Sequence, residues 1–380
     1  MLAGGHPILD RRIFHKEARS LVKAGYSVTI IGQHSSSRPF SEAGMSLIPL
    51  PSWPRVPVVG FFHRIFSLVR LGLKNQADVF HGHDPESLLA GLFLKLWTGR
   101  KLVYDVHEIF AEAPHDLKTL LVFPGLYLVE GLLCRAADLV IAVTDPLADH
   151  VRRRGARNVI TVENLALLDV LKRARPMPRS ALGLKKEHIV FGYFGHMSNI
   201  MATNELINGF QEFRRREPRA RLLLIGNVTD PDALTAMGND AGIIHRPFMR
   251  YEDVLPYYSV LDVGLMNLRD IPPAYMAIST KLFEFMYYRI PVLTGDTLVQ
   301  NVAIVRRAKC GLAFRWNDPR DLADKMDFLA RRPGLRRRMG ANARAAVIRR
   351  YHWGVAERRL LEAYRDLAPR GPSMYSKPIK

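Results

Sequence analysis

Short apolar runs alternate with longer amphipathic segments along most of this 380-residue chain. Each run is as long as a buried strand, and the segments between them carry apolar residues three and four positions apart, the spacing of a helix packed on a core. Repeated alternation of strands and helices is typical of a parallel sheet with helices on its faces. The chain contains two successive series of this kind, so we predict an α/β protein with two domains.

The first series occupies residues 1–172. A helix is expected to begin at Asp10, with Ile13 and Leu21 facing inward, and to end at Gly25. Only Met1 to Ala3 precede the Gly4-Gly5 pair, so a strand before this helix is either very short or the start of the chain has been trimmed. The other expected strands are 27–31, a short one within 78–84, 101–106, one within 135–144, and 159–163.

The second series occupies residues 173–350. Its expected strands are 189–194, 221–225 and 260–266, and its expected helices are 204–216, one from 252, and 319–330. The segment LKRARPMPRS at 171–180 carries two prolines and four cations, which favours a linker. A last amphipathic helix is predicted at 351–368, followed by a disordered tail at 369–380.

Residues 271–293, IPPAYMAISTKLFEFMYYRIPVL, predict a loop, a helix and a strand in that order. Ser279 or Thr280 can cap the helix, whose N-terminal end attracts phosphate. Lys281 and Glu284 lie three apart, and a carboxylate accepts hydrogen bonds from adjacent ribose hydroxyls. The segment therefore suits a nucleoside diphosphate. An ordinary amphipathic helix with a solvated Lys–Glu pair is the alternative.

Composition indicates a globular protein, with 48% hydrophobic and 24% charged residues. Its two cysteines, Cys134 and Cys310, lie far apart in apolar surroundings, which favours a reducing, cytosolic compartment. The net charge of +19 requires anionic partners or a strongly solvated surface. The segment from Arg331 to Arg359 contains ten arginines and only one acidic residue. It lacks the combination of basic and aromatic residues found in nucleic-acid-binding modules, so we do not expect the protein to bind nucleic acid.

No apolar run is long enough for a membrane-spanning helix. After a proline-rich loop, an apolar stripe of helical spacing is flanked by cations; the stripe is Phe62, Ile65, Phe66, Val69 and Leu73, beside Arg64, Arg70 and Lys74. Such a helix can lie on anionic lipid, or it can be a core helix whose cations extend to solvent. The predicted location is cytoplasmic, at the inner face of the membrane if the helix binds lipid.

Two predicted strands end in histidine and carboxylate residues. His81, His83 and Asp84 follow the strand within 78–84, and His107 with Glu108 follows 101–106. The ends of parallel strands meet at one sheet edge, where open α/β folds bind ligands. Because His81 and His83 are expected on opposite faces of the strand, and His107-Glu108 lacks the second histidine of a zinc helix motif, we predict no metal site.

The segment TKLFEFMYYRIPV resembles the donor-binding segment of the retaining GT-B glycosyltransferases of family 4, also called group 1. In that family a Glu-x7-Glu element ends on a ribose-binding glutamate, which Glu284 matches. Met276 stands where the first glutamate is usual, and Arg289 stands where glycine is usual. The resemblance implies two Rossmann-like domains facing one another across a cleft, with the last helix returning to the N-terminal domain.

The resemblance also implies the site residues. His107 and Lys281 are the expected catalytic residues, and the expected donor-binding residues are Gly195, His196, Arg246, Thr280, Lys281, Leu282 and Glu284. The expected acceptor side comprises Gly4, Gly5, Asp10, His83 and Asp84. His196 and Ala202 replace the usual arginine and lysine, so Lys281, the helix end and Arg246 are expected to neutralise the diphosphate.

The implied activity is transfer of a hexose from a UDP-, GDP- or dTDP-sugar to a glycan or lipid-linked acceptor, with retention, in cell-surface polysaccharide synthesis. Neither a metal nor a cofactor besides the donor is expected. Asp230-Pro-Asp232 matches a metal-binding Asp-x-Asp, but its position favours a helix cap. A sugar-nucleotide epimerase, a non-catalytic nucleotide-sugar-binding protein and a nucleic-acid binder remain alternatives; the chain lacks the glycine-rich motifs of dinucleotide and triphosphate enzymes.

Overall fold

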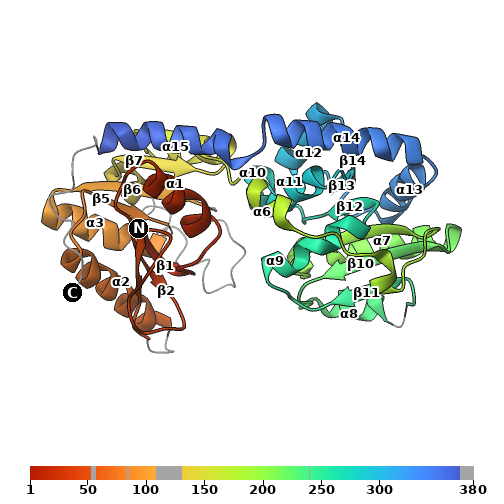
Figure 1. The fold of residues 1–380 in the computed structure, drawn as a ribbon, viewed down its shortest axis with the longest axis horizontal. Coiled ribbons are helices and arrows are strands. Elements are labelled where there is room, and N and C mark those ends of the chain that lie inside the picture. Colours follow the sequence, from red (N-terminus) through yellow and green to blue (C-terminus); the bar gives the residue numbers. More distant parts are fainter. Residues whose placement is uncertain (53–56, 84, 108–130, 239, 369–380) are drawn as a thin grey trace. The chain divides into compact units, whose positions relative to one another are not determined.

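The structure is a computed structural model that describes residues 1–368 except 53–56, 84, 108–130 and 239. Its contacts divide the chain into two units (Figure 1). Unit 1 comprises Met1–Asn164 and the segment that begins at Trp353, and unit 2 comprises Leu165–His352. The sequence placed the first boundary at 172; in the structure, residues 168–173 form a helix that packs within unit 2. The predicted disordered tail at 369–380 lies outside the described residues.

Unit 1 contains a sheet in the order β3-β4-β2-β1-β5-β6-β7-β8, parallel except for the β3–β4 pair. Its strands are β1 (Leu2–Pro7), β2 (Thr29–Gln33), β3 (Phe40–Glu42), β4 (Met45–Pro49), β5 (Val79–Gly82), β6 (Lys101–Val106), β7 (Leu139–Ala142) and β8 (Val159–Thr161). Its helices are η1 (Ile13–Ala18, a π-helical turn), α1 (Arg19–Lys23), α2 (Pro57–Lys74), α3 (Pro85–Thr98), α5 (Asp145–Arg153) and α15 (Trp353–Leu367). The parallel sheet predicted for the first series is therefore present.

Strand β1 differs from the prediction. It extends to Pro7 and includes Gly4 and Gly5, which were expected in a loop. Its register with β2 is irregular between Ala3 and Pro7, so these glycines lie in a bulged stretch of strand. The Gly4 N–H donates to Ser87 Oγ at 2.9 Å, and Gln33 donates to the Gly4 carbonyl at 2.8 Å. The bulge is thus held by side chains on both sides.

Unit 2 contains a parallel sheet in the order β11-β10-β9-β12-β13-β14. Its strands are β9 (Ile189–Phe194), β10 (Ala220–Ile225), β11 (Ile243–Arg246), β12 (Val263–Met266), β13 (Val292–Gly295) and β14 (Gly311–Phe314). Its helices include α6 (Leu168–Arg173), α7 (Thr203–Arg216), α8 (Pro231–Met237), α10 (Pro272–Met276), α11 (Thr280–Tyr287), α12 (Val299–Ala308), α13 (Pro319–Ala330) and α14 (Pro333–Arg349). Buried aromatic rings of β9 and α7 form much of the core on one face.

The last helix, α15, belongs to unit 1 although it follows unit 2 in the chain. Trp353 at its start donates to Ser20 Oγ at 2.9 Å, and Tyr364 near its end lies 2.7 Å from His81 Nδ1. Among the described residues, no helix is both long and apolar enough to cross a membrane.

Candidate functional site

The carboxyl edge of the unit 2 sheet brings Gly195 and Lys281 together. Gly195 follows β9 with a φ of +146°, a conformation that favours glycine. A Cβ atom placed on Gly195 would lie only 2.9 Å from Lys281 Nζ. The ammonium group of Lys281 therefore lies against bare backbone at the end of a central strand, where a phosphate group can approach both.

Helix α11 begins at Thr280, as the sequence predicted, but its cap differs. Ser279 occupies the N-cap position without a side-chain hydrogen bond to the helix, and its N–H donates to Asn301 Oδ1 at 3.1 Å. The predicted side-chain cap is therefore wrong for Ser279. The side chain of Leu282 is fully buried, so only its backbone is available to a ligand.

Glu284 lies on the buried side of α11 and is only 4% exposed. Its Oε2 atom accepts a hydrogen bond from the Tyr258 hydroxyl at 2.5 Å. The Tyr258 ring stacks on Tyr288 with centroids 5.1 Å apart and meets Phe194 edge to face. This aromatic packing fixes the position of the hydroxyl and, through it, that of the carboxylate.

The other expected donor residues lie at the same sheet edge but have partners of their own. His196 Nε2 lies 3.0 Å from Thr229 Oγ1, and its carbonyl accepts a bond from Tyr193. Arg246 ends β11, and its guanidinium donates to the His245 carbonyl at 3.1 Å. Asp230 caps α8 by accepting from the backbone of the first turn, as predicted.

Two positions at which the sequence departs from the family pattern have left-handed backbone. Arg289 has a φ of +61°, just after α11 ends, which is the position where helices commonly use glycine. Ala202 has a φ of +47° at the N-cap of α7. Glycine is usual at position 289 because of this left-handed turn, which Arg289 also adopts.

In unit 1, His107 lies just beyond β6 and its Nε2 atom is 2.8 Å from Asp105 Oδ2. A carboxylate at this nitrogen holds it protonated and leaves Nδ1 as the acceptor. The His107 ring lies 5.2 Å from the His6 ring. Asp10, by contrast, is occupied with the backbone, since its Oδ1 accepts from the N–H groups of Arg12 and Ile13.

Asp105 is buried and contacts several polar side chains. It accepts two hydrogen bonds from the Arg12 guanidinium, at 2.7 and 2.8 Å, in addition to its contact with His107. Burial, the largest single effect, raises the pKa of Asp105, but the Arg12 charge together with the charge and hydrogen bond of His107 and the hydrogen bond of His83 holds the pKa of this carboxyl well below its usual range. For Glu17, 2.9 Å from Arg12 Nε, burial and the Asp105 charge raise the pKa well above its usual value.

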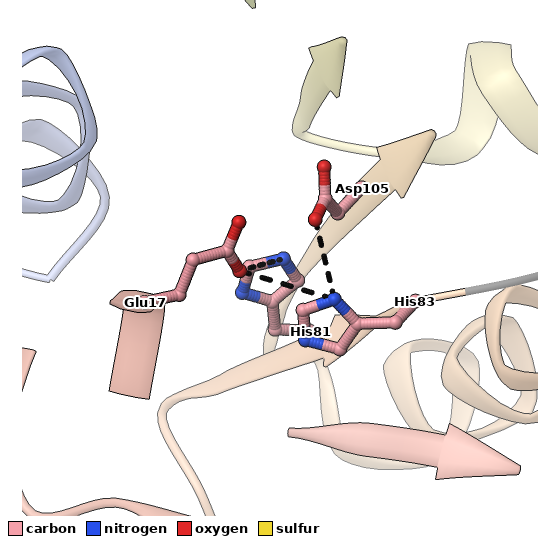
Figure 2. A group of neighbouring side chains, drawn as sticks. All are labelled: Glu17, His81, His83 and Asp105. Carbon is pink, nitrogen blue, oxygen red and sulfur yellow. Dashed lines mark hydrogen bonds and ion pairs between the residues drawn. The ribbon is translucent and has the colours of Figure 1, made fainter. Parts of the chain in front are cut away.

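The structure corrects the expectation that His81 and His83 point to opposite faces. Their rings stack with centroids 4.2 Å apart, and both face Glu17 (Figure 2). The expectation was wrong because residues two positions apart on a strand point to the same face, so alternation itself places His81 and His83 together. Burial lowers the pKa of His83 to about 4, although the Asp105 hydrogen bond opposes this. His83 is fully buried within unit 1, which argues against the direct acceptor contact expected for it.

Sequence patterns missed several residues of these sites: Arg12, Glu17, Asp105, Tyr258 and Tyr364. Glu17, Asp105, Tyr258 and Tyr364 are polar side chains within an otherwise apolar run or helix face, which was the one signal for them in the sequence. Arg12 follows Asp10 and Arg11, so its sequence context gives no such signal. Their partners lie up to 283 positions away, so local spacing could not identify them. Asp84 and Glu108 lie outside the described residues.

Family models match both halves of the chain. A glycosyl transferase 4-like domain matches residues 11–164, and the glycosyl transferases group 1 model matches residues 188–332. Alpha-D-kanosaminyltransferase of Streptomyces kanamyceticus is 25% identical over 303 residues, which cover 76% of this chain and 77% of that protein. D-inositol 3-phosphate glycosyltransferase of Frankia alni is 25% identical over 199 residues, 49% of this chain and 47% of that protein.

Solved structures share the fold at lower identity. A sucrose-phosphate synthase from Thermosynechococcus elongatus has a TM-score of 0.74 and 18% identity, covering 96% of this chain and 94% of that one. Anabaena Alr3699/HepE, in complex with UDP-glucose, has a TM-score of 0.73 and 15% identity, covering 96% and 99%. WaaG, a glycosyltransferase involved in lipopolysaccharide biosynthesis, has a TM-score of 0.67 and 13% identity, covering 97% and 100%.

Proposed function

Because the chain belongs to the group 1 glycosyltransferases of family 4 and has the GT-B fold, we propose that it transfers a hexose from a nucleoside diphosphate sugar to a glycan or lipid-linked acceptor. We propose further that the reaction retains the anomeric configuration and serves cell-surface polysaccharide synthesis in the cytoplasm. The observation that carries the proposal is the contact of Lys281 with Gly195 beside the N-terminus of α11.

Departure of the nucleoside diphosphate is the difficult step of such a transfer, so groups that stabilise the developing negative charge matter most. Lys281 supplies a full positive charge, and the α11 N-terminus supplies the partial charge of its dipole. Gly195 lets the diphosphate approach the backbone. Arg246 and His196 are assigned secondary donor roles, because both have protein partners in this structure.

Glu284 is assigned to the ribose. A buried carboxylate held by one tyrosine hydroxyl retains acceptor capacity for the two ribose hydroxyls. Anabaena Alr3699/HepE has been solved with UDP and with UDP-glucose, which supports uridine donors as the first to test. GDP- and dTDP-sugars remain candidates.

His107 is assigned to the transferred sugar and the acceptor. The carboxylate of Asp105 fixes its ring and leaves Nδ1 as a hydrogen-bond acceptor, and His107 is 22% exposed while Asp105 is fully buried. Gly4, Gly5 and Asp10 are assigned to the acceptor side. An anionic membrane surface is proposed as a further partner of unit 1.

We propose that no divalent metal assists the diphosphate, because Lys281 and the helix end supply the positive charge there. Millimolar Mg²⁺ or Mn²⁺ should then leave the initial rate unchanged. A rate lost on brief exposure to EDTA and restored by Mg²⁺ would contradict this part of the proposal.

The central test combines a donor screen with Glu284→Ala. Calorimetric titration with UDP-, GDP- and dTDP-sugars should identify one preferred base. With that donor, Glu284→Ala should reduce kcat/KM by roughly 10- to 100-fold, the effect of losing hydrogen bonds to a charged group. Unchanged affinity and kinetics would eliminate the ribose role, and a melting curve like that of the wild type would show that the variant is folded.

The same assay separates the alternatives. A transferase releases nucleotide in proportion to the glycosylated acceptor. A sugar-nucleotide epimerase would change the donor without an acceptor, and a non-catalytic binding protein would bind the donor without releasing nucleotide. Met276 replaces the first glutamate of the family element. This replacement is the reason for testing whether the protein binds the donor without transferring its sugar.

A further inference from the structure

Four buried side chains in unit 1 form a compact group of potential metal ligands (Figure 2). Glu17 comes from η1, His81 from β5, His83 from the bend after it, and Asp105 from β6. One ligand atom from each lies within 4.8 Å of all the others. All four residues are at most 1% exposed.

Within the group, hydrogen bonding accounts for the contact of His83 Nδ1 with Asp105 Oδ2 at 3.3 Å but not for the contacts of Glu17 with the two histidines. Glu17 Oε2 lies 3.8 Å from His81 Nε2 and 3.8 Å from His83 Nδ1, beyond the range of a hydrogen bond. Among the described residues, Glu17 Oε2 and His81 Nε2 have no hydrogen-bond partner, whereas Glu17 Oε1 forms an ion pair with Arg12 Nε at 2.9 Å. Polar atoms buried in this way are costly, so their convergence on one point requires another explanation.

The group is close to the spacing that one metal ion requires. Bonds of about 2.0–2.1 Å to a tetrahedral centre place neighbouring ligand atoms roughly 3.3–3.4 Å apart. His83 Nδ1 and Asp105 Oδ2 are 3.3 Å apart, the two Glu17 separations are 3.8 Å, and all four ligand atoms lie within 4.8 Å of one another. We propose that Glu17 Oε2, His81 Nε2, His83 Nδ1 and Asp105 Oδ2 bind one divalent transition-metal ion of the Zn²⁺ type.

Arg12 is the main competitor for these carboxylates, and its position is compatible with the site. Its guanidinium donates to both oxygens of Asp105, including Oδ2 at 2.7 Å, and contacts Glu17 Oε1. Glu17 Oε2 faces the histidines instead. In the proposed site Asp105 Oδ2 therefore keeps its hydrogen bond from Arg12 while it binds the ion.

The surroundings have the outer contacts that metal ligands usually have. His81 Nδ1, the nitrogen opposite the proposed bond, lies 2.7 Å from the Tyr364 hydroxyl. Asp105 is held by Arg12 through two hydrogen bonds. Such contacts orient ligand side chains and raise metal affinity.

Imidazole and carboxylate ligands suit Zn²⁺ and its first-row neighbours. Four protein ligands in a buried, closed site are typical of a structural role, without an open position for substrate. The ion would join η1 to the ends of β5 and β6 and, through His81 and Tyr364, to α15. This proposal does not depend on the donor chemistry assigned to unit 2.

The test measures metal in the full chain without an affinity tag. After chelator treatment and incubation with Zn²⁺, desalted wild-type protein should retain about one equivalent by mass spectrometry and melt at a higher temperature than the chelator-treated form. Glu17→Gln should retain less than a tenth of that amount and show no Zn²⁺-dependent melting shift. His34→Asn, which removes an exposed imidazole from the same unit, should behave like the wild type.

A second measurement uses the wild type alone, in case Glu17→Gln does not fold. Co²⁺ added to the chelator-treated protein should give the visible absorption of a four-coordinate ion, and Zn²⁺ should displace it. Zn²⁺ retention below a tenth of an equivalent together with absent Co²⁺ bands would overturn the proposal. A folded Glu17→Gln variant that retains as much Zn²⁺ as the wild type would also overturn it.

Discussion

The Tyr258 hydroxyl is the residue-scale contact that defines the donor site most sharply. Its hydrogen bond to Glu284 crosses from the segment before β12 to α11, and stacking on Tyr288 fixes the ring. A carboxylate that is 4% exposed has few orientations available. Tyr258 is therefore a positioning residue for the proposed ribose contact.

Tyr258→Phe removes that hydroxyl and keeps the ring. We expect UDP affinity, measured by calorimetry, to fall by roughly 3- to 10-fold, about 1 kcal/mol for one hydrogen bond. Because both residues act through one contact, adding Tyr258→Phe to Glu284→Ala should cause little further loss. Additive losses in the double variant would show that Tyr258 acts independently of Glu284.

Candidate site residues could be predicted from the sequence where their position at a helix start or a strand end identified them. Lys281 was indicated by the predicted helix start, and Gly195, at the end of a predicted strand, was implied by the family resemblance; the structure brings the two together. The partners of Glu284 and His81 were not predictable, because Tyr258 and Tyr364 reach them through tertiary packing. His83 was misplaced because alternation separates neighbouring residues, whereas His81 and His83 are two positions apart and share a face.

At the scale of elements, α2 has features of both hypotheses that the sequence left open, a core helix and a lipid-binding helix. Ile65 and Leu68 are buried, as a core helix requires, whereas Phe62 and Phe66 are 63% and 66% exposed. Helix α3, which packs on α2, adds three exposed apolar side chains, Phe93, Leu96 and Trp97. Arg70 and Lys74 of α2 are also exposed. This combination of apolar and cationic groups suits an anionic lipid surface.

Replacing both Phe62 and Phe66 with serine should reduce binding to vesicles that contain anionic lipid by roughly tenfold or more, since each phenyl ring loses burial in the membrane interface. Co-sedimentation measures the effect, and raised salt should weaken wild-type binding through Arg70 and Lys74. Phe248→Ser is the matched control, because Phe248 is a similarly exposed ring in unit 2. Equal sedimentation of the double serine variant and the wild type would refute lipid binding by α2.

Elements with strong patterns were predicted almost to the residue: β6, β9 and α13 have the expected bounds. Strand β11 was missed because its sequence, IIHR, pairs two apolar residues with two polar ones at the sheet edge. The irregular stretch of β1 was assigned to a loop because two glycines usually indicate one. Here side-chain hydrogen bonds and sheet pairing override that preference.

At the scale of the whole molecule, unit 1 is built from two distant parts of the sequence. Helix α15 packs on η1 and α1 through a buried face of Trp353, Ala356, Leu360 and Tyr364. Arg359 adds an ion pair with Glu163 at 2.6 Å. The two series of strands predicted two domains, but that local pattern could not show which domain the last helix completes. That expectation came from the resemblance alone.

This arrangement predicts that unit 1 is incomplete without the end of the chain. In calorimetry, the full chain should show one transition that matches isolated unit 2, residues 165–352, and another that belongs to unit 1. A chain that ends at residue 352 should lose the second transition or shift it down by about 10 °C or more. The reason is that burial of a tryptophan alone contributes about 3–5 kcal/mol, and each kcal/mol moves the melting temperature of such a unit by about 2–4 °C.

Trp353→Ala should shift the same transition in the same direction and leave that of unit 2 unchanged. If the shortened chain kept the unit 1 transition at its original temperature, the helix would be an attachment to unit 1 and not part of its core.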